Sequence, residues 1–248
     1  MISSTKNTLI KEIRSLKDKK FRDKLGVFVL EGIKPVREAI ALNLSIREIV
    51  CTENTCQEFL ACGHKVEVVS EQVFKSISEE VTPQGVLAIV YKLPCEIVKA
   101  QGNSLLLDGV SDPTNVGAII RTAAASGFNN VYLTNTCADA YSQKAVRSSM
   151  SGIFRVKVMR GDIDDILSAV SSPLVIADMD GQDVFNMDVK GNVCLVIGNE
   201  GNGVSDYLKK KANLTVKIPM QNGVESLNAA VSAGILMYAL TTRLCSIT

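Results

Sequence analysis

The sequence predicts an α/β protein of two domains, the second built on a mostly parallel sheet. First, a chain of 248 residues exceeds the usual size of one domain. Second, strand-like and helix-like patterns alternate along it in two series, separated by a candidate linker from Pro94 to Ser104. Third, several apolar runs of the second series are uninterrupted, as in parallel strands covered on both faces. We therefore expect a small α/β domain over residues 1–94 and a larger one over residues 104–248.

The first domain is expected to begin with an amphipathic helix. Leu9, Ile13 and Leu16 recur at helical spacing, which predicts a helix over residues 7–20. Apolar runs and helical patterns alternate after it. The predicted strands are 28–32, 46–52, 65–70 and 85–92, and the predicted helices are 34–42, 54–61 and 71–78.

The second domain repeats this alternation with greater regularity. The predicted strands are 105–110, 130–134, 154–159, 174–178, 193–198 and 214–218. The predicted helices are 115–126, 142–150, 162–170, 204–210 and a long helix that begins at Ser226, whose hydroxyl can cap it. Ligands of open α/β sheets bind at the carboxyl ends of strands, so the turns that follow these strands are candidate site segments.

Composition favours a soluble, cytoplasmic protein. Hydrophobic residues make up 46% of the chain and charged residues 21%, no apolar run could span a membrane, and the first residues lack a secretory signal. The seven cysteines form no paired framework, which suits a reducing compartment. Cys51, Cys56, Cys62 and His64 could in principle bind zinc, but no Cys-x-x-Cys pair is present. We expect ordinary free cysteines and no metal site.

Positive charge is concentrated near the N-terminus. Residues 1–24 carry a net charge of +5, whereas the whole chain carries +1. Such an arm can contact RNA phosphates, because lysine and arginine release counterions from the backbone. A solvated helix face explains the same charges equally well. The predicted RNA-binding residues are Lys17, Lys19, Lys20, Arg22, Lys144 and Arg147.

The first candidate motif follows the predicted strand 105–110. Residues 108–117 read Asp-Gly-Val-Ser-Asp-Pro-Thr-Asn-Val-Gly and lead to Arg121. Helical side chains lean toward the N-terminus of their helix, so Arg121 would lie over the turn that contains Gly117. This places a guanidinium at the strand-end crevice, although a surface arginine on a capped helix is the alternative.

The second motif, residues 197–203, reads Ile-Gly-Asn-Glu-Gly-Asn-Gly. Its glycines let the backbone approach a ligand. A phosphate-binding loop is excluded because Val204 and Ser205 stand where Lys-Ser/Thr is required. A dinucleotide-binding loop is excluded because Asp206 stands where the third glycine belongs.

The third motif, residues 218–228, reads Ile-Pro-Met-Gln-Asn-Gly-Val-Glu-Ser-Leu-Asn and precedes an apolar helix. Ala230, Gly234 and Tyr238 mark a helix face that is small enough for close packing. By itself this segment could be a buried core helix.

Together and in this order, the three segments resemble the signature motifs of the SpoU (TrmH-like) family of the SPOUT class: Asn-x-Gly-x-x-x-Arg, Gly-x-Glu-Gly-x-Gly, and Ile-Pro-Met followed by Glu-Ser-Leu-Asn. The likeness is strong over residues 104–245 and weaker over 5–92, where residues 28–32 and 83–85 look like the family's substrate-binding domain. Residues 147–152 read Arg-Ser-Ser-Met-Ser-Gly where relatives carry Arg-Ala-Ser-Met-Gly-Ala, so one glycine has moved by one place. We interpret this difference as variation near the substrate side.

The resemblance implies a trefoil-knot α/β domain over residues 104–248, a substrate-binding domain over 1–94, and a homodimer built through the knotted domain. It implies S-adenosylmethionine as methyl donor and 2′-O-ribose methylation of RNA, with ribosomal RNA favoured and transfer RNA as the alternative. The implied catalytic residues are Arg121, Asn115, Glu200, Ser226 and Asn228. The implied cofactor-binding residues are Thr134, Gly198, Asn199, Gly203, Ile218, Met220 and Leu227.

The reaction requires help with a proton, because a ribose 2′-hydroxyl is a poor nucleophile. His64 is the only histidine and belongs to the first domain, so the usual general base is absent from the second. The very high pKa of arginine conflicts with proton acceptance, so we assign Arg121 to positioning and electrostatic stabilisation.

Two other functions were weighed. A non-catalytic RNA-binding or ribosome-assembly protein would have no need of Arg121, Glu200, Ser226 and Asn228 together. A nicotinamide- or nucleotide-dependent enzyme is disfavoured by the failed glycine fingerprints.

Overall fold

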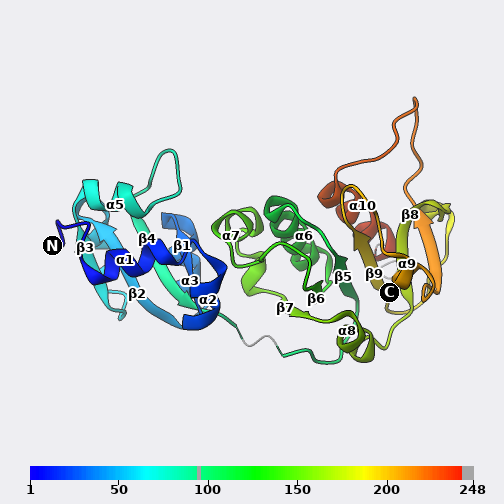
Figure 1. The fold of residues 1–248 in the computed structure, drawn as a ribbon, viewed down its shortest axis with the longest axis horizontal. Coiled ribbons are helices and arrows are strands. Elements are labelled where there is room, and N and C mark those ends of the chain that lie inside the picture. The colour runs from blue at the N-terminus through cyan, green and yellow to red at the C-terminus, as the bar shows by residue number, and fades with distance from the viewer. Residues whose placement is uncertain (94–95, 242–248) are drawn as a thin grey trace. The chain divides into compact units, whose positions relative to one another are not determined.

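The structure, a computed structural model, describes residues 1–93 and 96–241 (Figure 1). The described residues of Met1–Leu93 and Tyr141–Arg147 form unit 1, and those of Pro94–Ala140 and Ser148–Thr248 form unit 2. The domain limits 1–94 and 104–248 stay a prediction, and their residues 94 and 242–248 lie outside the described part. Helix α7 (Gln143–Ser149) begins in unit 1 and ends in unit 2.

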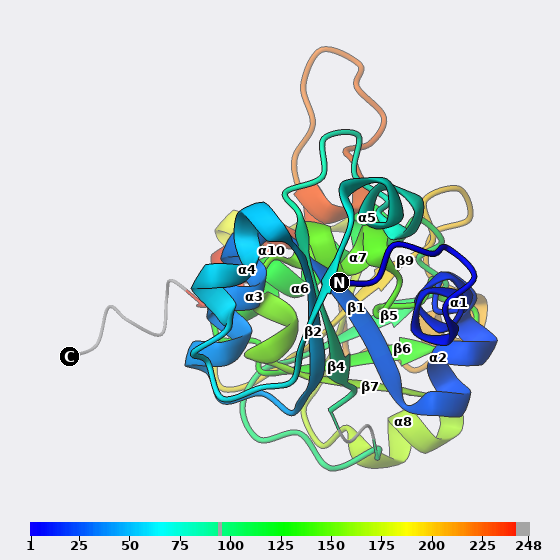
Figure 2. The same ribbon diagram turned by 90° about the vertical axis from the view of Figure 1, so that its left-hand side faces the viewer.

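Unit 1 is a four-stranded sheet between two helix layers. Strand β4 is antiparallel to β1 and to β2, and β2 is parallel to β3. The strands, in the sheet order β1-β4-β2-β3, are β1 (Val27–Glu31), β4 (Val86–Tyr91), β2 (Ile46–Thr52) and β3 (Val66–Val69). The helices are α1 (Thr8–Ser15), α2 (Lys19–Leu25), α3 (Ile33–Ala41), α4 (Glu53–Phe59) and α5 (Glu71–Ile77). Figure 2 shows α3 and α4 on one side of the sheet and α1 and α5 on the other.

The helix predicted over residues 7–20 is two helices. Helix α1 ends at Ser15, with Leu16 as its C-cap, and the carboxylate of Asp18 accepts a hydrogen bond from the backbone N–H of Lys20 (2.9 Å), which caps α2. Ile10, Ile13 and Leu16 are buried in the core of unit 1. The apolar spacing therefore identified the buried face correctly, whereas the cap at Asp18 was not recognised.

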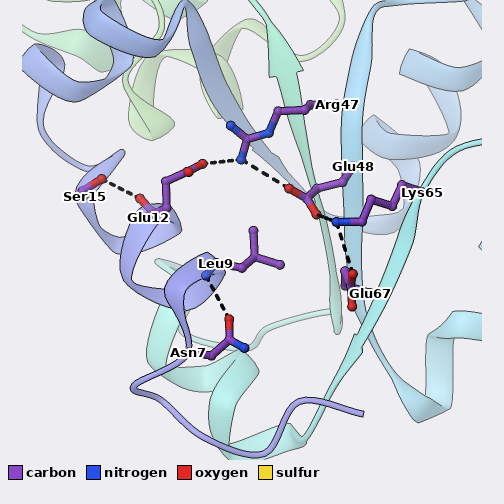
Figure 3. Close-up of polar contacts among 8 residues, drawn as sticks. All are labelled: Asn7, Leu9, Glu12, Ser15, Arg47, Glu48, Lys65 and Glu67. Carbon is purple, nitrogen blue, oxygen red and sulfur yellow. Dashed lines mark hydrogen bonds and ion pairs between the residues drawn. The ribbon is translucent and has the colours of Figure 1, made fainter.

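A chain of ion pairs links α1, β2 and β3 (Figure 3). Arg47 pairs with Glu12 and, at 3.3 Å, with Glu48. Lys65 joins Glu48 at 3.0 Å and Glu67 at 3.2 Å. Glu48 is almost fully buried, so its charge requires these partners. The chain ties the first helix to the sheet.

The two segments that look like the family's substrate-binding domain lie side by side in unit 1. The side-chain carbonyl of Gln84 accepts a hydrogen bond from the backbone N–H of Ile33 (2.8 Å) at the start of α3, next to Gly32. The carboxylate of Glu31 accepts hydrogen bonds from Ser78 and from the backbone of Glu79. These contacts hold both ends of the 78–85 loop.

Cys51 is buried, and Cys56 and Cys62 are partly buried. Among the residues that the structure describes, no group of three His, Cys, Asp or Glu side chains is arranged to hold a metal ion. Within the same residues, none of the helices has both the length and the apolar character needed to cross a membrane.

Unit 2 is a six-stranded sheet in which every pairing is parallel. The strands, in the sheet order β10-β8-β9-β5-β6-β7, are β10 (Leu214–Lys217), β8 (Leu174–Asp183), β9 (Cys194–Gly198), β5 (Ser104–Asp108), β6 (Asn130–Thr134) and β7 (Lys157–Gly161). The helices are α6 (Pro113–Ser126), α8 (Ile163–Ala169), α9 (Asp206–Lys209) and α10 (Ala229–Thr241). The predicted α/β class with a parallel sheet is confirmed.

Each face of this sheet is covered by helices. Ile166 of α8 and Leu208 of α9 pack with Leu106 and Val196 in one core cluster. Helices α6 and α10 pack against each other, and α10 also contacts β9. The strand predicted at 154–159 begins instead at Lys157, because residues 152–154 form a 3₁₀ turn.

Five consecutive residues of strand β8 are not paired with its neighbour β10. Ile176 pairs with Thr215, but the next residue of β10, Val216, pairs with Gln182. Residues 177–181 therefore bulge out of the ladder at the carboxyl end of the β8 segment that pairs with β9.

Candidate active site

The first two motifs contain facing positions at the ends of neighbouring strands. Asp108 at the end of β5 is in register with Gly198 at the end of β9. Strand β5 is where the chain order changes direction, since β6 and β7 lie on one side of it and β9, β8 and β10 on the other. Such a switch point is where α/β sheets bind ligands.

A cavity of about 840 Å³ opens beside this edge, lined by the ends of β9 and β10 and by residues 177–180 of β8. Among its lining residues are six of the seven predicted cofactor-binding residues: Gly198, Asn199, Gly203, Ile218, Met220 and Leu227. The seventh, Thr134, is not part of the lining. Its buried hydroxyl accepts a hydrogen bond from the backbone N–H of Gly109 (3.0 Å), so Thr134 stabilises the backbone of the first motif.

The loop of the second motif is closed tightly on itself. Asn199 and Gly203 exchange two backbone hydrogen bonds of 2.9 Å. The side chain of Asn199 accepts from the backbone of Gly201 (3.0 Å) and donates to the carbonyl of Gly109 (2.8 Å). A Cβ atom at Gly198 would lie 2.1 Å from the carbonyl carbon of Gly203, so only glycine fits there. Asn199 thus joins the two motifs.

The carboxylate of Glu200 is the main polar anchor of the site. It accepts hydrogen bonds from the backbone N–H of Ser111 (3.1 Å), the hydroxyl of Ser111 (3.0 Å), and the side-chain N–H of Asn115 (2.9 Å). The backbone N–H of Asp112 also donates to it (3.3 Å). Desolvation acts to raise the pKa of Glu200, but these hydrogen bonds outweigh it and lower the pKa to about 2. Glu200 is therefore a fixed anion and a weak base.

Asn115 carries the network to the third motif. Its side-chain carbonyl accepts a hydrogen bond from the side-chain N–H of Asn228 (2.9 Å), while its N–H donates to Glu200. The Asn228 oxygen accepts from the backbone N–H groups of Ala230 (2.9 Å) and Val231 (3.3 Å). Asn228 is thus the cap of α10, and the prediction that Ser226 caps this helix is wrong. Ser226 lies in the cavity wall.

Arg121 is placed differently from the other predicted catalytic residues. It lies on α6 with an exposed side chain and is not part of the cavity lining. No hydrogen bond or ion pair joins its side chain to another residue in the described parts of the chain. The structure therefore brings Asn115, Glu200 and Asn228 into one hydrogen-bond network. The Arg121 guanidinium is not part of this network.

Sequence reasoning missed part of the wall. Asp178, Met179 and Asp180, from the bulge of β8, line the same cavity as the glycine loop. Lys209 of α9 lines it too and pairs with Asp178 at 2.7 Å. The signal was available, because Asp178 ends a predicted strand next to the second motif, at the edge where ligands bind.

The predicted RNA-binding residues divide into two groups. Lys17, Lys19, Lys20, Lys144 and Arg147 are exposed. Arg22 is only 4% exposed, and its guanidinium donates hydrogen bonds to the carbonyls of Leu16 (2.6 Å) and Lys17 (2.7 Å). Arg22 therefore satisfies the carbonyls at the end of α1, and its assignment to RNA contact is corrected.

Comparisons with known proteins agree with this geometry. Residues 102–238 match the model of the SpoU rRNA Methylase family, and residues 7–88 match an MRM3-like substrate binding domain. The 23S rRNA (guanosine(2553)-2′-O)-methyltransferase RlmP of Bacillus subtilis is 33% identical, over 96% of this chain and 98% of that protein.

Two solved structures have the same architecture. The AdoMet-bound rRNA methyltransferase of Sinorhizobium meliloti has a TM-score of 0.89 and 30% identity, over 98% of this chain and 97% of that one. The SpoU methyltransferase AviRb of Streptomyces viridochromogenes, in complex with AdoMet, has a TM-score of 0.84 and 25% identity, over 97% and 99%. On the family match, the near full-length relative and the shared motifs, this chain belongs to the SpoU methylase family.

Proposed function

We propose that this protein transfers a methyl group from S-adenosylmethionine to a ribose 2′-hydroxyl of RNA, with ribosomal RNA as the substrate. The observation that carries the proposal is the cavity at the carboxyl end of β9, walled by the second and third motifs and joined to the first motif by the Glu200 network. The relatives support the target, because RlmP and a Streptomyces viridochromogenes relative are both named 23S rRNA 2′-O-methyltransferases.

The cavity fits this methyl donor in size and chemistry. Its volume of about 840 Å³ suits a ligand of this size. Ile197, Ile218 and Leu227 offer apolar surface for a flat base, and the carboxylate of Asp180 favours a cation, whereas that of Asp178 is paired with Lys209. Bound there, S-adenosylmethionine would present an electrophilic methyl group on a positively charged sulfur.

Residues of this chain hold the site in place, orient the ribose and stabilise the developing charge. Glu200, with a pKa of about 2, is too weak a base to take the hydroxyl proton, so we assign it to holding Asn115 and the first motif in place. Asn115 and Asn228 keep the start of α10 next to this anchor. Arg121 then orients the ribose and stabilises the negative charge that develops on its oxygen.

We further propose that residues 104–248 are knotted and that the protein forms a homodimer in the cytoplasm. Family membership supports the knot. The dimer is supported by α10, which buries Ala233, Leu236 and Met237 on one side and leaves Val231 and Tyr238 about half exposed on the other. A helix that is apolar on all sides requires cover on both.

Gly198→Val should weaken S-adenosylmethionine binding at least 10-fold in calorimetry. We expect the added side chain to collide with the backbone of Gly203 and Val204 and open the loop, rather than to collide with the ligand alone. Gly234→Ala is the control, because its Cβ would meet only Thr122 at an ordinary 3.5 Å. Undiminished affinity in Gly198→Val would place the cofactor elsewhere.

Arg121→Ala should lower single-turnover methyl transfer about 100-fold or more while cofactor affinity stays the same, because one transition-state stabiliser is lost. Arg121→Lys should restore little, since one ammonium cannot replace the planar guanidinium. The assay follows labelled methyl transfer to RNA, beside a substrate with 2′-deoxyribose at the target nucleotide. Equal methylation of the deoxy substrate would refute ribose methylation.

Replacing Lys17, Lys19 and Lys20 together by glutamine should weaken RNA binding and reduce its salt dependence by a slope of about 2 to 3. Lys17 and Lys19 are exposed and make long ion pairs of 3.6 and 3.7 Å with carboxylates that are at least partly exposed, so both are available to phosphates. Deleting residues 1–24 is unsuitable, because Ile10, Ile13 and Leu16 belong to the core. The control replaces the same three lysines by arginine and should keep the salt dependence of RNA binding. An unchanged salt dependence in the glutamine variant would show that these lysines only face solvent and do not contact RNA.

Val231→Glu should convert the dimer into a monomer in sedimentation velocity, because a charge would be placed in the apolar contact. Val231→Ala removes area without adding charge and should remain dimeric at micromolar concentration. A monomeric wild-type protein would contradict the proposed dimer, and a dimeric Val231→Glu variant would move the interface away from this face of α10.

A further inference from the structure

The turn that follows β6, residues 134–138, is held by one side chain of the neighbouring strand. Arg160 of β7 is in register with Leu133, the residue just before this turn. Its guanidinium donates hydrogen bonds to four backbone carbonyls of the turn, those of Thr134 (3.2 Å), Asn135 (3.2 Å), Cys137 (3.0 Å) and Ala138 (2.5 Å). The shape of the turn therefore depends on Arg160.

Only an arginine can make this set of contacts. Carbonyl oxygens that converge on one point repel one another unless a cation lies between them. Backbone carbonyls that are buried without a partner are also costly. A guanidinium answers both requirements, because it spreads its charge over a rigid plane with five N–H donors, whereas the ammonium of lysine is a compact charge with three.

The same turn is bonded to the first motif. The hydroxyl of Thr134 accepts a hydrogen bond from the backbone N–H of Gly109 (3.0 Å). The backbone N–H of Ala138 donates to the carbonyl of Val110 (2.8 Å). Both ends of the turn therefore fix the backbone that continues β5.

The first motif is held from both of its neighbouring strands. Asn199, from the loop after β9, donates to the carbonyl of Gly109 (2.8 Å). Ser111 donates to the Glu200 carboxylate through its backbone N–H (3.1 Å), and α6, which carries Arg121, begins two residues later. Movement of the turn after β6 would therefore shift the helix whose guanidinium we assign to the ribose.

We infer that Arg160 is a positioning residue for methyl transfer: it fixes the 134–138 turn, and this turn fixes the first motif and the start of α6. This inference rests on the proposed function. Among the described residues that line the cofactor cavity, none comes from β5, α6, β6 or β7. Arg160 therefore acts on the ribose side of the reaction and not on cofactor binding.

Arg160→Ala should lower single-turnover methyl transfer about 10-fold or more at saturating cofactor and RNA, because small displacements of a positioned group already impair catalysis. The affinity for S-adenosylmethionine in calorimetry should stay within about 2-fold, since an interaction used only in the transition state affects the rate alone. General damage to the fold would weaken both. Lys157→Ala, which removes an exposed cation from the same strand, is the matched control and should leave both unchanged.

The free cation should rescue the variant. Arg160 lines an open cavity of about 580 Å³, so guanidinium can reach the space that Arg160→Ala leaves. Millimolar guanidinium chloride, far below the molar concentrations that unfold proteins, should restore part of the rate. Sodium chloride at the same ionic strength should restore nothing. If Arg160→Ala does not fold, Arg160→Lys replaces it and should show the same loss of rate at unchanged cofactor affinity, because one ammonium cannot serve four carbonyls.

Each outcome decides the inference. Full activity of the Arg160 variant, or a loss of rate matched by an equal loss of cofactor affinity, would overturn it. So would an Arg160→Ala variant that guanidinium does not rescue, because the effect would then come from the lost hydrocarbon stem. A wild-type protein that methylates no RNA would refute the proposed function and this inference with it, whereas the other contrary outcomes, obtained beside an active wild-type protein, refute the inference alone.

Discussion

The hydrogen bonds received by the Glu200 carboxylate hold together segments that are far apart in the sequence. Through them the turn after β5, the glycine loop after β9 and, by way of Asn115, the start of α10 become one structure. Charge-assisted bonds are the strong ones, and a pKa of about 2 means that the anion persists under all ordinary conditions. Because this pKa is lowered, the stabilisation is complete above the usual carboxyl range and is lost only as the pH falls toward 2.

Backbone contacts set the second constraint. Segments of the chain approach each other so closely that a single Cβ atom would not fit, at Gly198 against Gly203 in the cavity wall and at Gly152 against Arg121 outside it. Neither glycine has a positive φ, so the requirement is for space and not for an unusual conformation. A site assembled in this way has little freedom to rearrange. This suits a methyl transfer, in which the attacking oxygen, the methyl carbon and the sulfur must be aligned.

The sequence predicted elements well where burial decides them and poorly where local polar contacts do. Uninterrupted apolar runs identified the parallel strands of unit 2, and the family likeness located the cavity wall. The break between α1 and α2 at Asp18, the cap at Asn228 and the burial of Arg22 each depend on one or two hydrogen bonds between a side chain and backbone groups. Periodicity carries no information about these. The bulge at 177–181 depends on the register between β8 and β10, which no local pattern specifies.

One part of the site is held in place by hydrogen bonds between its own residues, and another part is not. Glu200, Asn115 and Asn228 already satisfy one another, so the region beside the cavity needs no ligand to take shape. The Arg121 side chain has no such partner in the described chain, and the backbone N–H of Val224 in the exposed segment 221–226 donates within the segment, to Gln221 (3.2 Å). Figure 1 shows the segment before α10 as a long loop. An exposed guanidinium is well hydrated and acts weakly on a distant charge. Its electrostatic effect becomes strong when RNA, or a second copy of the chain, excludes water around it. Binding of the large substrate would therefore complete the reacting centre as well as deliver the hydroxyl to it.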